Sequence, residues 1–342
     1  MTRVAIVQRP PFLLDRAASI QSAVASVRDA AAGGAQLIVF PEAFVPGYPV
    51  WIWRLKPGDD ARLTAEIHAR LLANAVNLGA GDLAPLGEAA RRHKVTIVIG
   101  VNERDANFSR GTLYNSVVTI GADGAILNCH RKLMPTNPER MVWGMGDATG
   151  LSVVDTPCGR VGALICWENY MPLSRYALYA QGVEVYVAPT YDSGQTWIAS
   201  MQHIAREGGC WVLGSGFALR GKDVPADFPG KAGLYPDPEE WINEGDSLIV
   251  APGGKIVAGP LHREFAILTS DIDLNQCSAA RRTLDTAGHY ARPDIFQLHV
   301  NRQPLTPIEF AATQQPTKNW SRADGASSFS AASQTGPCAD TR

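Results

Sequence analysis

The chain contains 342 residues, of which 46% are hydrophobic and 19% charged, and this balance predicts a globular protein with a substantial core. The formal net charge is −2 and basic residues cluster only in short groups such as His130-Arg131-Lys132, so nucleic acid is not an expected partner. Polar residues interrupt the N-terminus and no apolar run reaches the roughly 18 residues of a membrane span, so we expect neither a signal peptide nor a membrane partner.

In the first third of the chain, short β-branched runs alternate with patterns typical of helices. Asp15 can cap a helix that Gly33-Gly34 ends. The other predicted elements here are strands over residues 4–7, 37–40 and 95–101 and a helix over residues 82–93. A strand therefore precedes and follows each predicted helix.

The rest of the chain predicts two hairpins and further alternation of strands with helices. The elements, in order, are a hairpin of residues 116–120 and 125–129, a strand over 161–165, a helix over 173–181, a strand over 183–188, a helix over 197–207, a strand over 210–214, a hairpin of 247–251 and 255–258, and a strand over 265–271. This order indicates an α/β fold in which helices cover mixed sheets. We expect one domain over residues 1–305 and a disordered tail over 306–342, where Pro, Thr, Gln, Ser and Ala dominate.

Cysteine and histidine spacing gives no sign of a bound metal. The six cysteines include no Cys-x-x-Cys pair, and the seven histidines show no spacing typical of ligands. The sequence therefore predicts reduced thiols, a cytoplasmic protein, and neither a metal nor an organic cofactor.

Chemically capable side chains follow four of the predicted strands. Glu42 follows the strand over 37–40, Lys132 the strand over 125–129, Cys166 the strand over 161–165, and Tyr191 the strand over 183–188. Because the carboxyl ends of parallel strands meet at one edge of a sheet, we expect the carboxylate, the amine and the thiol to converge there.

Together, Glu42, Lys132 and Cys166 suit catalysis by a thiol nucleophile. An ordinary thiol, with a pKa of about 8.5, is only a few per cent ionised at neutral pH. A carboxylate can accept its proton, an ammonium favours the thiolate, and the backbone N–H of Trp167 adds a donor for a developing anion. Singly, each residue also fits a structural role: Cys166 as a buried apolar side chain, Glu42 as a cap, and Lys132 as a surface charge.

Three stretches of the sequence resemble the nitrilase superfamily, and more narrowly its true nitrilases. They are Phe40-Pro41-Glu42-Ala43-Phe44, His130-Arg131-Lys132-Leu133-Met134-Pro135-Thr136 and Cys166-Trp167-Glu168-Asn169-Tyr170-Met171-Pro172. The resemblance implies that Glu42, Lys132 and the nucleophile Cys166 form the Glu–Lys–Cys triad of that family, with Glu139 in support. It also implies an αββα sandwich that assembles as a homodimer or a larger spiral homo-oligomer.

The resemblance further implies hydrolysis of an organic nitrile by water, through a thioimidate and a thioester on Cys166, to a carboxylic acid and ammonia. Glu139 is expected to position Lys132 or a water, although an ion pair with Arg140 fits the sequence as well. We expect five aromatic residues near the motifs to bind the substrate: Tyr48, Trp51, Trp143, Trp167 and Tyr191.

Three alternatives stay open. An amidase or carbamoylase would use the same triad, so the triad does not separate it from a nitrilase. A cyanide hydrolase would not need a pocket for an organic side chain, and the aromatic residues disfavour it. A catalytically silent subunit that serves as an oligomeric scaffold has no chemical need for an intact Glu, Lys and Cys set.

Overall fold

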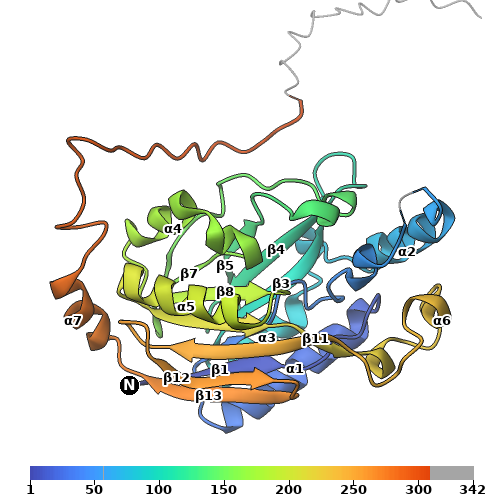
Figure 1. Ribbon diagram of the computed structural model, residues 1–342, viewed down its shortest axis with the longest axis horizontal. Coiled ribbons are helices and arrows are strands. Elements are labelled where there is room, and N and C mark those ends of the chain that lie inside the picture. Colours follow the sequence, from blue (N-terminus) through green and yellow to red (C-terminus); the bar gives the residue numbers. More distant parts are fainter. Residues whose placement is uncertain (57, 309–342) are drawn as a thin grey trace, which may run out of the picture. The chain divides into compact units, whose positions relative to one another are not determined.

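The strands form two separate sheets in the computed structural model, which describes residues 1–56 and 58–308 (Figure 1). The first sheet has the order β13 (Ala266–Ile272), β1 (Thr2–Gln8), β2 (Leu37–Val39), β3 (Thr96–Arg104), β4 (Leu113–Ile120) and β5 (Ile126–Arg131). β1, β2 and β3 are parallel, whereas β4 is antiparallel to both β3 and β5. It follows that β2 and β5 run in the same direction and end at the same edge.

The second sheet repeats this design. Its order is β10 (Ala218–Arg220), β11 (Trp241–Val250), β9 (Trp211–Gly216), β8 (Val185–Thr190), β7 (Gly159–Ala163) and β6 (Val154–Thr156), and β12 (Ile256–His262) pairs with β11. The strands β7, β8 and β9 are parallel, so β7 and β8 also end at one edge.

Along each central strand, alternate residues point to opposite faces of the sheet, and both faces are buried. In β2, Leu37 and Val39 pack into the core between the two sheets, and Ile38 packs into the core beneath the helices. A strand covered on both faces needs apolar residues on both, which explains the unbroken apolar run in the sequence.

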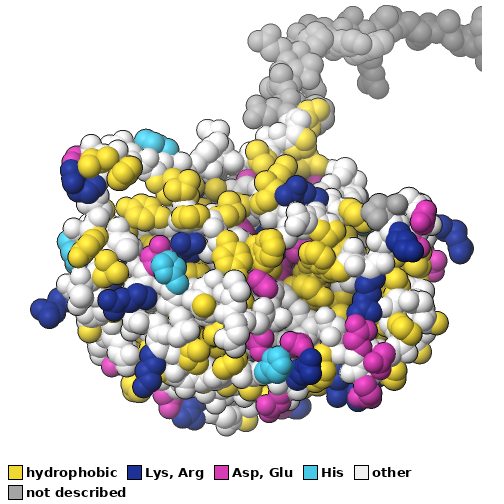
Figure 2. Space-filling view, viewed as in Figure 1, with side chains coloured by type: hydrophobic (Ala, Val, Ile, Leu, Met, Phe, Trp, Pro, Cys, Tyr) yellow, Lys and Arg dark blue, Asp and Glu magenta, His cyan; other side chains and the backbone are white. Residues whose placement is uncertain are grey.

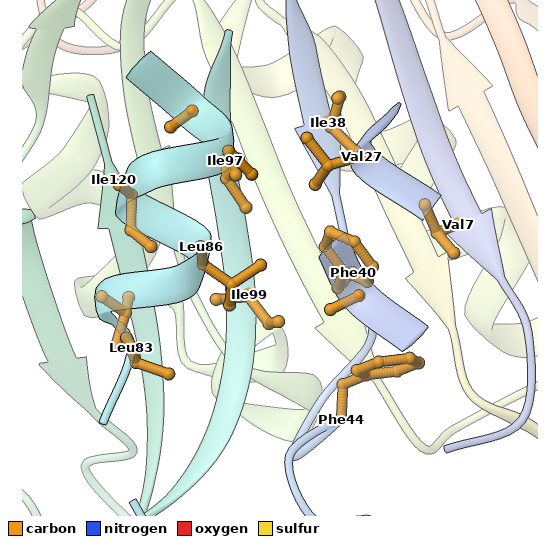
Figure 3. Packing of buried hydrophobic residues seen from close by; sticks show 14 of the residues in the cluster. Val7, Val27, Ile38, Phe40, Phe44, Leu83, Leu86, Ile97, Ile99 and Ile120 are labelled. Atoms are coloured by element: carbon orange, nitrogen blue, oxygen red, sulfur yellow. The ribbon is translucent and has the colours of Figure 1, made fainter. Parts of the chain in front are cut away.

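Helices cover the outer face of each sheet. α1 (Arg16–Ala32) and α3 (Ala84–His93) pack on the first sheet, and α4 (Pro172–Tyr179) and α5 (Gln195–Gly208) on the second. Figure 3 shows Leu86 of α3 with Ile99 of β3, and Val27 of α1 with Ile38 of β2, in one apolar cluster. The four layers are helix, sheet, sheet and helix, which confirms the predicted αββα sandwich.

The predicted boundaries agree with the structure at α1, and differ at β5. The Asp15 carboxylate accepts a hydrogen bond from the Ala18 N–H at 2.9 Å, and the helix ends before Gly33. β5 continues to Arg131, beyond the predicted end at 129, because Arg131 still pairs with Ser116 of β4.

Three helices and several short segments have no counterpart in the sequence prediction. The helices are α2 (Ala61–Asn74), α6 (Lys231–Leu234) and α7 (Asn275–Thr283), and five 3-10 turns are η1 (Val50–Trp53), η2 (Leu78–Ala80), η3 (Asn137–Met141), η4 (Cys166–Tyr170) and η5 (Gly221–Asp223). In α2 only Ile67 and Leu71 are buried, so its apolar face is too narrow to stand out in the sequence.

Residues 1–305 form one compact unit. The tail predicted over 306–342 lies, from residue 309 onward, outside the described residues. On the face shown in Figure 2, the charged side chains of the described residues are interspersed, and no broad area of one sign is visible there. No helix in the described part of the chain has the length and apolar character needed to cross a membrane.

Candidate active site

The candidate catalytic residues lie where strand ends from the two sheets face each other. Glu42 and Lys132 follow β2 and β5 of the first sheet, and Cys166 and Tyr191 follow β7 and β8 of the second. The residues therefore converge as expected, but across two facing sheets rather than along one edge of a single sheet.

Lys132 lies at the centre of a buried charge cluster. Its Nζ is 2.8 Å from Glu42 Oε1 and 2.8 Å from Glu139 Oε2, and all three side chains are buried. Lys132 is thus not a surface charge. Glu139 pairs with Lys132 rather than with Arg140, whose Nε donates to the Pro135 carbonyl at 3.1 Å.

The Glu42 carboxylate is held by groups from both sheets. The Asn115 side-chain amide of β4 donates to Oε1 at 2.7 Å, and the Tyr191 N–H after β8 donates to Oε2 at 2.7 Å. The loop that carries Glu42 also needs glycine at position 100, where a Cβ would lie 2.3 Å from the Pro41 carbonyl oxygen. A side chain at position 100 would displace Glu42.

Glu139 is fixed at the start of η3. Its Oε2 accepts a hydrogen bond from the Thr136 N–H at 2.7 Å, and its Oε1 accepts one from the Tyr48 hydroxyl at 2.6 Å. Tyr48 in turn stacks on Tyr191, with ring centroids 4.0 Å apart and planes within 4°. The aromatic pair therefore links the Glu139 side of the site to the Glu42 side.

Cys166 is the first residue of η4 and has an uncommon backbone conformation. Its φ is +52°, in the left-handed region that costs a residue with a side chain about 1–2 kcal/mol. The Asn169 side-chain amide stabilises the turn by donating to the carbonyls of Cys166 at 2.7 Å and Leu164 at 2.9 Å. Such strain, held by dedicated hydrogen bonds, is typical of functional positions.

Burial and charge set the protonation of the cluster. Burial, reinforced by the Glu42 carboxylate, raises the pKa of the Cys166 thiol, and the Lys132 ammonium opposes this only in part. Burial also raises the pKa of Glu42 above its ordinary value, against the effect of Lys132. For Lys132 burial lowers the pKa, but Glu42, Cys166 and Glu139 outweigh it and the pKa is raised. The Cys166 thiol therefore lies beside an ammonium and beside a carboxylate that can accept its proton.

A cavity of about 370 Å³ opens onto Cys166. Its wall consists of Tyr48, Trp53, Thr136, Glu139, Cys166, Trp167, Tyr191, Asp192, Ser193, Trp241, Ile242, Asn243 and Glu244. Trp53 and Trp167, both 47% exposed, lie at its rim. Asp192 holds Trp167 there by accepting from the indole N–H at 2.9 Å.

Three of the five aromatic residues predicted to bind substrate line this cavity, and two do not. Tyr48, Trp167 and Tyr191 are in the wall. Trp51 is buried against Phe228, with ring centroids 5.6 Å apart. Trp143 lies behind the wall, in edge-to-face contact with Tyr48, and the two ring centroids are 5.5 Å apart.

Several wall residues were not predicted from the sequence. Trp241, Ile242 and Asn243 come from the start of β11, which precedes the strand predicted over 247–251 and carries no motif. For Trp53 the sequence fitted a pocket wall and a core or interface position equally well, and Asp192 follows Tyr191 directly, so its acidic side chain was the available signal. Within residues 1–56 and 58–308, no group of three or more His, Cys, Asp and Glu side chains could hold a metal ion.

A buried thiol beside a carboxylate and an ammonium, at the facing ends of two sheets, defines a cysteine hydrolase of the αββα type. The family model described as carbon-nitrogen hydrolase matches residues 3–282, and the chain belongs to this family. The membership predicted from the three sequence motifs is thereby confirmed.

Curated relatives match over almost the whole chain. A bifunctional nitrilase/nitrile hydratase, NIT4B of Nicotiana tabacum, is 39% identical over 93% of this chain and 91% of its own length. An aliphatic nitrilase of Sinorhizobium fredii is 40% identical over 90% of this chain and 97% of its own length. Nitrilase 2 of Arabidopsis thaliana is 40% identical over 91% of both chains.

Solved structures share the fold at lower sequence identity. The carbon-nitrogen hydrolase of Helicobacter pylori G27 has a TM-score of 0.63 at 19% identity, over 82% of this chain and 92% of its own. Nit3 of Saccharomyces cerevisiae, from branch 10 of the nitrilase superfamily, has a TM-score of 0.62 at 19% identity, over 84% of this chain and 96% of its own.

Proposed function

We propose that this protein is a nitrilase, which hydrolyses an organic nitrile to a carboxylic acid and ammonia with Cys166 as nucleophile. The observation that carries the proposal is the buried Glu42–Lys132 ion pair, with 2.8 Å between the charged atoms, beside the Cys166 thiol. The nitrilase names of relatives near 40% identity support the choice of a nitrile. Residues 1–305 are the proposed hydrolase domain, since every residue of the site lies within them.

The first step forms a thioimidate. Glu42, whose pKa is raised by burial, accepts the thiol proton of Cys166, and sulfur adds to the nitrile carbon. The charge that develops on nitrogen is stabilised by the Lys132 ammonium and by the backbone N–H of Trp167. The proton held by Glu42 passes to this nitrogen, so the site has no net change of charge.

The next steps release ammonia and then the acid. Water adds to the thioimidate carbon with Glu42 as general base, the carbon–nitrogen bond breaks, and ammonia leaves a thioester on Cys166. A second water hydrolyses the thioester to the acid and restores the thiol. Glu139 holds Lys132 in place through its 2.8 Å ion pair, and is a positioning residue rather than a proton carrier in this scheme.

Tyr48, Trp167 and Tyr191 are the proposed substrate contacts, because they line the cavity next to Cys166. Their rings offer apolar faces to an organic side chain, and the cavity of about 370 Å³ has room for one. This geometry disfavours cyanide, which has no side chain to fill the space.

Release of amide is a second candidate outcome, because one group of relatives is named bifunctional nitrilase/nitrile hydratase. After water adds, breaking the carbon–sulfur bond instead of the carbon–nitrogen bond would give an amide and the free thiol.

The test is a panel of nitriles with their matching amides, in which acid, amide and ammonia are measured together. Acid and ammonia from nitriles with inert amides support a nitrilase, whereas turnover of amides alone assigns an amidase or carbamoylase with the same triad.

We also propose a cytoplasmic location and a homodimer or larger spiral homo-oligomer. Free thiols at Cys129, Cys158, Cys166, Cys210 and Cys277 fit a reducing compartment. Tyr170, Met171 and Leu173 are exposed on and beside α4, and offer an apolar surface for self-association. Sedimentation analysis over a range of concentrations tests the assembly, and a monomer throughout would contradict it.

A further inference from the structure

His130 and Glu168 form a buried pair that lies outside the cavity and has no step in the proposed reaction. Their side chains are 1% and 0% exposed. The Nε2 atom of His130 lies 3.1 Å from each carboxylate oxygen of Glu168. A buried carboxylate is strongly unfavourable unless hydrogen-bond donors surround it, so the contacts of Glu168 indicate which segments it holds together.

The same carboxylate binds the backbone on both sides of the site. Its Oε1 accepts a hydrogen bond from the Leu133 N–H, and its Oε2 accepts one from the Ile165 N–H, each at 2.7 Å. Leu133 directly follows Lys132, and Ile165 directly precedes Cys166. One side chain therefore ties the segment that carries the ammonium, on the first sheet, to the segment that carries the thiol, on the second.

His130 supplies the remaining donor to Glu168. Because an ionised carboxylate only accepts hydrogen bonds, Nε2 of His130 carries a proton. Its Nδ1 is buried and has no partner among the described residues. Burial acts to raise the pKa of Glu168, but His130 and the two backbone N–H groups outweigh it and lower the pKa, which keeps the carboxylate ionised.

We propose that the His130–Glu168 pair is a positioning device that sets the separation of the Lys132 ammonium and the Cys166 thiol. The proposal rests on the proposed function, because it gives the pair a role in aligning that site. Cys166 needs such support, since its φ of +52° is a conformation that the turn does not prefer by itself. Catalytic side chains have to be held within about 0.5 Å of the productive geometry by hydrogen bonds of this kind, so loss of the pair should act on kcat.

The test compares His130→Gln with His130→Leu. Glutamine places a donor N–H where Nε2 now lies, and leucine fills similar space without a donor. We expect His130→Leu to lower kcat by about 10- to 100-fold with KM within about threefold, by analogy with the loss of outer-shell partners at metal sites. His130→Gln, which keeps a donor, is expected to retain a kcat within about fivefold of the wild type.

Val27→Ala provides a matched control, because Val27 is on the buried face of α1, in the core between the helices and the first sheet. It is expected to lower thermal stability and to leave kcat unchanged at a temperature where all variants are folded. An equal loss of kcat in Val27→Ala and His130→Leu would overturn the proposal, since general destabilisation would then explain both. If His130→Leu does not fold, Glu168→Gln replaces it, and an unchanged kcat in that variant overturns the proposal as well.

Alkylation of Cys166 by iodoacetamide, located by peptide mass spectrometry, gives a readout independent of nitrile turnover. We expect it to be about three- to tenfold slower in His130→Leu, where the ammonium no longer faces the thiol correctly, and to recover in His130→Gln. If the wild type hydrolyses neither nitriles nor amides and this difference persists, the proposed function fails and the positioning role stands. Equal alkylation and equal kcat in all three proteins would refute the positioning role.

Discussion

Replacing Glu139 with glutamine removes one of the two negative charges beside the Lys132 ammonium and keeps the shape of the side chain. In the native site, Glu139 Oε2 lies 2.8 Å from Lys132 Nζ and 2.7 Å from the Thr136 nitrogen. A glutamine oxygen at this position retains both contacts, and its amide nitrogen then faces Tyr48, whose hydroxyl can accept a hydrogen bond. The variant therefore separates the effect of charge from the effect of packing.

The size of the effect follows from the distance. At an effective dielectric constant of about 20, unit charges 2.8 Å apart attract by about 6 kcal/mol. Desolvation offsets part of this attraction. Removing one partner of a buried ion pair lowers the free energy of unfolding by about 3–5 kcal/mol. Because the amide keeps its hydrogen bonds, we expect Glu139→Gln to lose only part of the electrostatic interaction that orients the ammonium. A loss of about 2–3 kcal/mol of transition-state stabilisation is a fall of about 30- to 150-fold in kcat/KM.

The same substitution is expected to speed the alkylation of Cys166. After burial and Glu42, the Glu139 carboxylate is a further cause of the raised pKa of this thiol, so its loss lowers the pKa. Each unit of pKa gives about tenfold more thiolate of about threefold lower nucleophilicity, and hence about threefold faster alkylation.

The assay measures ammonia release from a nitrile and the rate of iodoacetamide labelling at Cys166. Glu88→Gln, which changes an exposed carboxylate on α3, is the control and should alter neither rate. The reasoning is refuted if nitrile turnover by Glu139→Gln stays within about threefold of the wild type, because a loss of 2–3 kcal/mol requires more. It is equally refuted if turnover and alkylation fall together, since glutamine would then have disordered the site.

Three further predictions test the nucleophile, a buried carboxylate and the charge of the cavity. Cys166→Ala is expected to abolish turnover and keep the fold. Cys158→Ala, which removes another buried thiol, should stay active as a control. Substantial residual hydrolysis in Cys166→Ala would exclude Cys166 as nucleophile. The pKa of Glu168 lies below its ordinary value of 4.5, so its ionised form stabilises the fold above pH 4.5, and this contribution is lost as the pH falls through the folded-state pKa. In urea unfolding, the stability gap between the wild type and Glu168→Gln should be constant above pH 4.5 and shrink below it, and a gap that widens in acid would contradict this sign. The cavity wall includes the carboxylates of Glu139, Asp192 and Glu244 and, among the described residues, no Lys or Arg. Nitriles bearing a carboxylate should therefore show a KM at least about tenfold above that of neutral isosteres. Equal KM values would contradict this prediction.

The sequence predicted the main strands and their catalytic ends because both leave local signals. Unbroken apolar runs mark strands buried on two faces, and a polar residue directly after such a run, as at Cys166, is easy to notice. The arrangement of these strands in two sheets has no comparable local signal. It depends on which apolar faces pack together, and only the family resemblance indicated it beforehand.

The substrate cavity was predicted less well, for two physical reasons. Trp51 and Trp53 lie in one 3-10 turn, where neighbouring positions point in very different directions, so a sequence position near a motif does not tell which side chain faces the cavity. Trp53 lines the wall, whereas Trp51 is buried. The part of the wall from β11 is brought in by sheet pairing far along the chain, which local patterns do not record.

The division of the active site between two sheets gives the apolar layer between them a mechanical role. Val39 and Val187 pack in this layer, and the strands around them carry Glu42 and Tyr191. Packed sheets lie about 10 Å apart, a spacing set by the volume of the side chains between them. A methyl group added or deleted in this layer would therefore shift Glu42 relative to Tyr191, whose N–H binds the Glu42 carboxylate, without changing either residue. Variant libraries designed to change turnover should include these buried positions between the sheets as well as the cavity wall. Melting temperature and rate should be measured together for each variant.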